Sequence, residues 1–245
     1  MEMEMSPPLP CLAMVHGVGA KDQPPTATTL FSVADGRPLA GAGAGWLALE
    51  EELKNKYLCP TPQGWMLVHD PKATTTYLLD ATSRQKIQLP HLAVEQRLIP
   101  YCSCLLSGEP TAPGCPVLLV EPIDATIWYC RVGDSEWTMH EYDIGTVGDE
   151  YYVEKRVIAP IAAFGGRFYF NPVPAETRVL ELLLRPGAAA LAPVFGSVAR
   201  EPESTEDDGF VGTAEVFMVG TGDELYQVIL AQKAKTAGGT TRSGS

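Results

Sequence analysis

The stretch "GWMLVHDPKATTTYLLDATSRQKIQLP" (Gly64–Pro90) contains three apolar runs separated by two polar breaks. The runs Trp65–Val68 and Thr76–Asp80 are short and rich in aliphatic side chains, as strands buried on both faces are. The run Lys86–Leu89 alternates polar and apolar residues, as a strand with one wet face does. The stretch therefore predicts three strands of one antiparallel sheet, joined by turns.

A strand, a turn and a second strand with an aromatic near its middle recur five times along the chain. The strand pairs are Leu12–Val15 with Thr29–Val33, Trp65–Val68 with Thr76–Asp80, Val117–Val120 with Thr126–Cys130, Val157–Phe164 with Arg167–Phe170, and Glu215–Val219 with Glu224–Leu230. The aromatics are Phe31, Tyr77, Trp128, Tyr169 and Tyr226, 41 to 57 residues apart. This period is typical of β-propeller blades. We predict an all-β fold, a β-propeller-like ring of about five blade units that is incomplete or irregular.

The segment "GWLALEEELKNKYL" (Gly45–Leu58) departs from the strand pattern. Four apolar residues share one helical face, namely Trp46, Leu49, Leu53 and Tyr57. Two pairs have the spacing of i,i+4 ion pairs, namely Glu50–Lys54 and Glu52–Lys56. A short helix is therefore predicted near residues 46–57. The whole propeller domain is predicted at 11–232, after an N-terminal extension at 1–10, with an acidic loop at 199–209 and a disordered tail at 233–245.

Charge and composition limit the partners and the location. The 245 residues include 18 basic and 30 acidic side chains, a net charge of −12, which argues against nucleic acid and anionic membranes as partners. The start "MEMEMSPPLP" lacks the positive charge and apolar core of a secretory signal, and the apolar stretch Val179–Phe195 is interrupted by charges and prolines. We therefore expect a soluble cytoplasmic or nuclear protein whose six cysteines are reduced.

Three stretches resemble the plant KIB-type β-propeller family, a family of unknown function whose members often carry an F-box. The stretches are "PTPQGWMLVHDPKATTTYLLDATSRQKIQLPHL" (Pro60–Leu92), "CSCLLSGEPTAPGCPVLLVEPIDATIWYCRVGDSEWTMHEYDIG" (Cys102–Gly145) and "AFGGRFYFN" (Ala163–Asn171). The resemblance covers roughly residues 10–230 and implies a propeller fold. Family members with an F-box dock on the Skp adaptor of a ubiquitin ligase. This chain lacks an F-box segment and looks shortened after "GDELYQVIL", so Skp docking is not expected and ring closure is in doubt.

The pair His69–Asp70 is the most suggestive of chemistry, but no second ligand pair stands at metal-binding spacing. We interpret it as the end of a strand, with Asp70 forming the turn before Pro71. Cys102 and Cys104, with Cys115 and His91 nearby, have no matching C-x2-C pair and are interpreted as small buried apolar residues.

Four carboxylates offer an alternative. Asp80, Asp124, Asp134 and Asp143 are acids that could line a propeller channel as in some glycosidases, but they also stand where ordinary turn residues do. Nucleophile and phosphate-loop motifs are absent from the sequence. Three tryptophans are expected between blades: Trp65, Trp128 and Trp137. The alternative is that some of them lie on a loop face as binding anchors.

The function that we expect is that of a non-enzymatic protein-interaction propeller of the F-box-associated type, with an unidentified protein partner. No catalytic, cofactor-binding or metal-binding residue and no cofactor is predicted. The alternative is an enzyme that acts on a small molecule or glycan through channel carboxylates.

Overall fold

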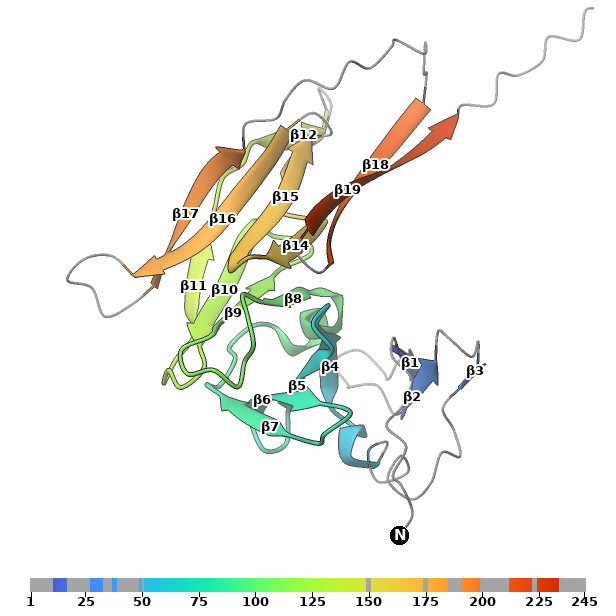
Figure 1. Cartoon of the computed structure of the whole chain (residues 1–245), viewed down its shortest axis with the longest axis vertical. Coiled ribbons are helices and arrows are strands. Elements are labelled where there is room, and N and C mark those ends of the chain that lie inside the picture. The colour runs from blue at the N-terminus through green and yellow to red at the C-terminus, as the bar shows by residue number, and fades with distance from the viewer. Residues whose placement is uncertain are drawn as a thin grey trace, which may run out of the picture.

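The computed structural model describes residues 11–16, 27–32, 37–38, 49, 51–148, 151–173, 176–184, 191–198, 212–221 and 224–233. Within these ranges the chain forms 19 strands in six antiparallel sheets (Figure 1). Helical structure is confined to a short turn ending at Leu53 and the 3-10 helix η1 (Gln96–Tyr101). The all-β prediction is confirmed. No helix in the described part of the chain is long and apolar enough to cross a membrane.

Three of the sheets are complete four-stranded blades in which each strand pairs with the next along the chain. The first blade comprises β4 (Tyr57–Pro60), β5 (Trp65–Asp70), β6 (Thr75–Asp80) and β7 (Lys86–Leu89). The second comprises β8 (Ser103–Leu106), β9 (Pro116–Val120), β10 (Thr126–Arg131) and β11 (Thr138–Glu141). The third comprises β14 (Ile161–Phe164), β15 (Arg167–Val173), β16 (Glu176–Leu184) and β17 (Leu191–Val198).

The other three sheets are smaller. A three-stranded sheet near the N-terminus comprises β1 (Cys11–His16), β2 (Ala27–Ser32) and β3 (Arg37–Pro38). A hairpin of β12 (Thr146–Gly148) and β13 (Val153–Lys155) lies in the connection between the second and third blades. The last sheet is the long hairpin of β18 (Gly212–Thr221) and β19 (Glu224–Lys233), which crosses beside β14 in Figure 1.

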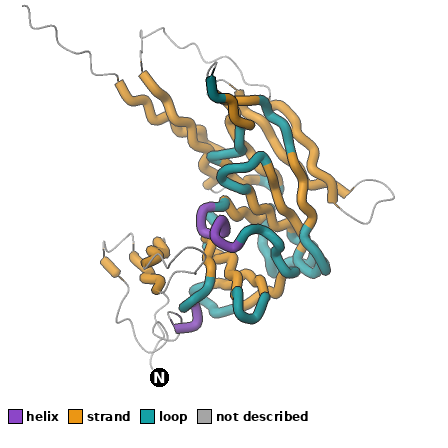
Figure 2. Tube along the Cα trace, turned by 180° about the vertical axis from the view of Figure 1, so that it is seen from behind, coloured by secondary structure: helices purple, strands orange, loops and turns teal. Residues whose placement is uncertain are grey.

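The first strand of each blade lies beside the first strand of the next. Strand β4 lies against β8, β8 against β14, and β14 against β18. Side-by-side first strands, with later strands stepping outward, are the arrangement of blades around a propeller axis. The three complete blades and the β18–β19 hairpin therefore form an arc, and Figure 2 shows the same succession of strand layers from behind.

Strand β9 of the second blade is apolar at every position because it is covered on both faces. In β9, Val117 and Leu119 belong to a core shared with the first blade, whereas Leu118 and Val120 belong to a core shared with the third. Neighbouring side chains on a strand point to opposite faces. The prediction that continuous apolar runs mark strands sandwiched between blades is therefore confirmed.

The outer face of the first blade is covered by the short helix. Leu49 and Leu53 are buried against Met66, Val68 and Leu79. The helix is shorter than predicted, because Asn55 has a φ of 60° and Tyr57 already belongs to β4. The expected Glu52–Lys56 pair does not form either: Glu52 binds Lys86 and Lys56 binds Asp70. Trp46 and Glu50 lie outside the described residues.

The five aromatics are not equivalent in the structure. Tyr77 and Trp128 lie on the third strands of their blades, whereas Tyr169 lies on the second strand of its blade. The aromatic residue that marks each repeat therefore lies one strand earlier in the third blade than in the first two. The strand predicted over Val157–Phe164 begins only at Ile161, directly after Pro160, which has no N–H to donate to a ladder.

Several sequence predictions fall beyond what the structure describes. These are the extension at 1–10, the acidic loop at 199–209 and residues 234–245 of the predicted tail. Lys233, which was assigned to the tail, is the last residue of β19. The strands β4, β8 and β17 were not predicted, because β4 and β8 are only four residues long and Pro193 and Gly196 interrupt the apolar run of β17.

Candidate functional site

The two ends of the blades are built by different connections. Because every strand reverses direction, the connections leaving the second and fourth strands of a blade gather at one end, and those leaving the first and third at the other. We call the first end the loop end; its described segments are 71–74, 90–102, 121–125, 142–148 and 151–160. We call the second end the turn end; its described segments are 61–64, 81–85, 107–115, 132–137 and 165–166.

The loop end exposes large apolar side chains. They come from three of its connections and are Tyr101, Ile123, Val147, Tyr151, Tyr152 and Val153. Tyr151 is 92% exposed and Ile123 is 68% exposed, values typical of a polar side chain. Exposed apolar side chains that gather on one surface mark an interaction site more often than scattered ones do.

The described connections of the turn end have no exposed large apolar side chain; the exposed residues nearest to them are Leu183 and Leu184, at the tip of β16. Its connections close by turn chemistry. The Asp80 carboxylate accepts the Thr82 N–H at 2.8 Å, and the Asp134 carboxylate accepts the Arg131 N–H at 2.8 Å. Gly165 and Gly166 both have positive φ and form the two-residue turn that the sequence predicts. This end is therefore compact and polar.

The β12–β13 hairpin is anchored to the second and third blades. The Tyr142 N–H donates to Ala125 O at 2.9 Å, and its hydroxyl accepts the Ile158 N–H at 2.8 Å. The Arg156 guanidinium donates to the carbonyls of Pro172 and Thr146. These contacts fix the base of the hairpin while β12 and β13 themselves remain exposed.

Gly148 is required where β12 ends. Its φ is 133°, and a Cβ at this position would lie 1.9 Å from the Tyr152 carbonyl oxygen. Any other residue would therefore push the two strands of the hairpin apart. Tyr151 and Tyr152 lie immediately before the exposed strand β13, and Val153 is its first residue.

The surface around the hairpin is acidic. Four exposed carboxylates and two cations surround it: Asp124, Glu141, Asp143 and Glu154, with Lys155 and Arg156. Lys155 lies 4.0 Å from Glu141, and Arg156 is held by carbonyl groups. The remaining negative charge faces solvent beside the exposed tyrosines.

His69 and Asp70 end strand β5 at the loop end, as the sequence predicts. His69 is fully buried, and its Nδ1 lies 3.0 Å from the Thr76 hydroxyl. Its Nε2 has no hydrogen-bond partner among the described residues. Burial, and then the nearby His91, lower the pKa of His69, and Asp70 only partly opposes them. The ring is therefore neutral at physiological pH.

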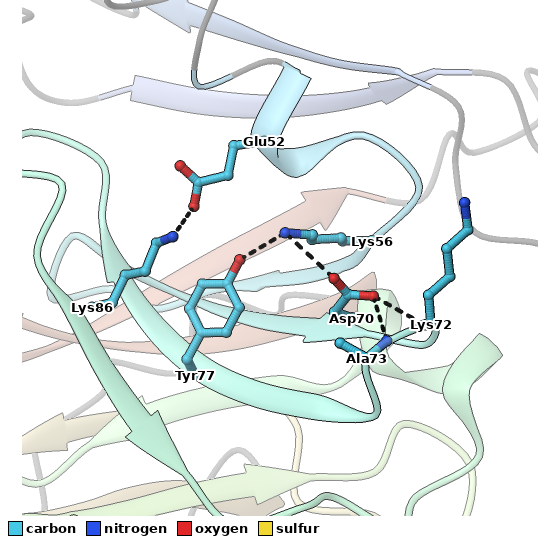
Figure 3. Close-up of polar contacts among 7 residues, drawn as sticks. All are labelled: Glu52, Lys56, Asp70, Lys72, Ala73, Tyr77 and Lys86. Atoms are coloured by element: carbon cyan, nitrogen blue, oxygen red, sulfur yellow. Dashed lines mark hydrogen bonds and ion pairs between the residues drawn. The ribbon is translucent and has the colours of Figure 1, made fainter.

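Asp70 belongs to a polar cluster on the outer face of the first blade (Figure 3). The cluster joins Glu52, Lys56, Asp70, Tyr77 and Lys86. Lys56 donates to the Tyr77 hydroxyl at 3.1 Å, and the ammonium groups of Lys56 and Lys86 lie 5.6 and 5.4 Å from the centre of the Tyr77 ring. These contacts tie the helix to β4, β5, β6 and β7, and so stabilise the outer face of the blade.

Hydrogen bonds control the charges in this cluster. Burial raises the pKa of Asp70, but the N–H groups of Ala73 and Lys72 and the Lys56 ammonium outweigh it and lower that pKa overall. The bond to Glu52 raises the pKa of Lys86. Asp70 therefore forms the turn before β6, as predicted, and Lys86 stays charged.

Five cysteines whose burial the structure describes are buried free thiols, as predicted for Cys102, Cys104 and Cys115. Cys59, Cys102, Cys104 and Cys130 all lie in the core between the first and second blades. Burial raises the pKa of the Cys102 and Cys130 thiols. His91, in the connection that leaves the first blade, is exposed, and its Nδ1 forms a hydrogen bond with the Thr74 carbonyl oxygen. In the part of the chain that the structure describes, no group of three or more potential ligands is placed to hold a metal ion.

The four candidate carboxylates lie at opposite ends of the blades. Asp80 and Asp134 are at the turn end, whereas Asp124 and Asp143 are at the loop end. Asp143 accepts the Gly145 N–H at 2.9 Å, and the backbone carbonyl of Asp124 accepts the Thr126 N–H. The structure thus places these acids in turns and does not bring all four together.

The tryptophans connect blades. Trp65 and Trp137 lie in the core between the first and second blades, and Trp128 packs against it, half-buried. The Trp137 indole donates to Pro90 O at 3.0 Å, from the second blade to the exit of the first. The prediction of interblade tryptophans is confirmed.

Two features of the site were not found from the sequence. Glu121 is buried, and its carboxylate accepts the Trp128 indole N–H at 2.6 Å, although an acid after an apolar strand is normally a solvated strand end. The second is the exposed hairpin. The dipeptide Tyr151–Tyr152 directly after Asp149–Glu150 was a signal for it, because acidic side chains are seldom fully buried and tend to hold their neighbours in sequence near solvent.

A comparison with known protein families matches residues 30–243 to the KIB1-4 beta-propeller. No curated protein and no solved structure matches the chain. The matched range covers most of the chain and includes all three complete blades and the β18–β19 hairpin. The chain therefore belongs to the KIB1-4 β-propeller family.

Proposed function

We propose that this propeller binds another protein through its loop end. The observation that supports the proposal is the contrast between the two ends of the blades. Six large apolar side chains are exposed on three loop-end connections, whereas the described turn-end connections expose none and the turn end adds only Leu183 and Leu184, at the tip of β16. Loops held on a rigid scaffold are where proteins most often place their binding residues.

The composition of the surface fits a protein partner. Tyrosine is enriched at the centres of protein interfaces because it buries a large area with little loss of side-chain freedom. The loop end offers three tyrosines, namely Tyr101, Tyr151 and Tyr152, surrounded by polar side chains. Its resemblance to F-box-associated propellers supports a partner that is selected for ubiquitin ligation by another segment or subunit.

Affinity capture with the whole chain as bait, followed by quantitative mass spectrometry, tests the proposal. Three baits are compared: the unchanged chain, the double variant Tyr151→Ala with Tyr152→Ala, and Tyr226→Ala. The last is a matched control, because Tyr226 is, like Tyr152, an exposed tyrosine whose hydroxyl bonds to a glutamate two residues away.

We expect at least one captured protein to fall by about tenfold with the double variant and to remain with Tyr226→Ala, since truncation of a central interface tyrosine often costs this much. The purified partner should then bind the unchanged chain directly. If every captured protein is retained by the double variant, the loop end is not the binding surface and the proposal is wrong.

A further inference from the structure

We infer that the β12–β13 hairpin binds a segment of the partner protein that is rich in arginine and lysine. This inference rests on the proposed function, and it adds the chemistry of the partner. It follows from the charges around the hairpin, from the exposure of its tyrosines, and from a similar cluster elsewhere in the chain.

The first step is charge. The hairpin and its neighbours expose Asp124, Glu141, Asp143 and Glu154 against only Lys155 and Arg156. Both cations already have oxygen partners within this surface. A partner that meets this surface therefore gains by bringing positive charge, whereas an acidic partner is repelled.

The second step is the tyrosines. Tyr151 and Tyr152 expose 92% and 63% of their surface, and the Tyr152 hydroxyl donates to the Glu154 carboxylate. An arginine or lysine side chain can lay its cation over an aromatic face while pairing with a carboxylate at the edge of the ring. Neutral apolar partners would use the rings but would leave the carboxylates unpaired.

The third step is that the same chemistry already operates inside the chain. In the first blade, two ammonium groups lie 5.6 and 5.4 Å from the centre of the Tyr77 ring (Figure 3). Each is held by a carboxylate as well, Lys56 by Asp70 at 3.6 Å and Lys86 by Glu52 at 2.7 Å. Tyrosine with neighbouring carboxylates therefore holds cations in this fold, and the hairpin presents the same residue types to solvent.

Fluorescence anisotropy with labelled peptides and the whole chain tests the inference. The probe is a Gly/Ser peptide of about twelve residues with about four arginines, long enough to cross a typical peptide site. The comparison peptide has glutamate in place of each arginine. We expect binding of the arginine peptide alone, and binding that weakens as sodium chloride is raised, because exposed ion pairs are screened.

The variants locate the site. Tyr151→Ala with Tyr152→Ala should weaken binding of the arginine peptide by about tenfold, and Glu154→Gln by about threefold. Glu154→Lys should abolish binding while leaving both tyrosines in place, which separates loss of the site from loss of the fold. Tyr226→Ala should bind the peptide as the unchanged chain does.

Equal binding of the arginine and glutamate peptides, or full binding by the Tyr151/Tyr152 double variant, would overturn the inference. The result is distinguishable from failure of the proposed function. If capture of a protein requires Tyr151 and Tyr152 but is unaffected by Glu154→Lys, the proposed function holds and the inference of a basic segment is wrong. If no loop-end variant reduces the capture of any protein, both are wrong.

Discussion

The loop end and the turn end of the blades are formed by the same strands but by different residues. At the turn end, aspartates and glycines form the turns, and carboxylates such as that of Asp80 accept hydrogen bonds from backbone N–H groups. At the loop end, the connections between successive blades are longer, and Tyr151 and Ile123 face solvent. Asp70 and Asp143 accept backbone N–H groups at the loop end as well, so the two ends differ mainly in their exposed apolar surface.

The first prediction concerns the core that both ends share. Phe168 is fully buried between the second and third blades. Phe168→Ala should lower the free energy of unfolding by about 3–5 kcal/mol, because it removes apolar contacts and leaves a cavity. Urea denaturation followed by tryptophan fluorescence measures it. Met139→Ala, at an exposed position of β11, is the control and should change little. A small effect of Phe168→Ala would mean that the blades do not share a packed core.

The second prediction uses pH. His69 is buried with a lowered pKa, so it binds a proton more readily in the unfolded chain than in the folded one. Stability is therefore fully present above the unfolded pKa of about 6.5 and falls as pH drops below it, by at most about 1.4 kcal/mol per pH unit for this one group.

Denaturant midpoints between pH 8 and pH 5 measure this dependence. His69→Gln removes the titrating ring and should flatten the curve near pH 6. His91→Gln should flatten the curve only in part, since His91 is one cause of the lowered pKa of His69 and the burial of the ring, which is the larger cause, remains. An unchanged curve in His69→Gln would assign the pH dependence to other groups.

The third prediction compares one aspartate from each end. Asp80→Ala at the turn end removes bonds to the Thr82 N–H and the Ser83 hydroxyl and should cost about 1 kcal/mol. Asp124→Ala at the loop end leaves its backbone bond to Thr126 in place and should cost less than about 0.5 kcal/mol. Thermal melts of the two variants compare the costs. If both variants lose the same amount of stability, the two aspartates contribute equally to folding and the two ends do not differ in this respect.

The fourth prediction has the smallest effect on stability. Tyr151→Ala with Tyr152→Ala should shift the free energy of unfolding by less than about 0.5 kcal/mol, because exposed side chains away from the core contribute little to folding. The measurement is the same urea denaturation. A loss of more than about 2 kcal/mol would show that these tyrosines serve the fold, and their exposure would then lose its functional meaning.

The sequence predicted the elements of the blades better than their grouping. Strands β5, β6, β9 and β10 were identified because apolar runs bounded by turn residues are a local signal. The order of strands within the third blade was misjudged by one strand, because an aromatic on the second strand resembles one on the third. The helix end was also misplaced, since Lys56 and Glu52 find their partners in β5 and β7 and not along the helix.

The candidate site was only partly predictable. Turn roles for Asp70 and Asp80 followed from local chemistry, as did the buried cysteines. The burial of His69 and Glu121 did not, because both residue types are usually solvated and their burial depends on partners contributed by other strands.

The sequence by itself determined the all-β class, the blade-sized repeat and the acidic charge, because these depend on composition and on periodicity along one strand. Only the tertiary structure decided which connections share an end of the blades. That gathering depends on strand direction and on the stacking of β4, β8, β14 and β18, which bring residues as far apart as Tyr101 and Tyr151 to the same end of the arc. The candidate binding surface is therefore a property of the stacked blades.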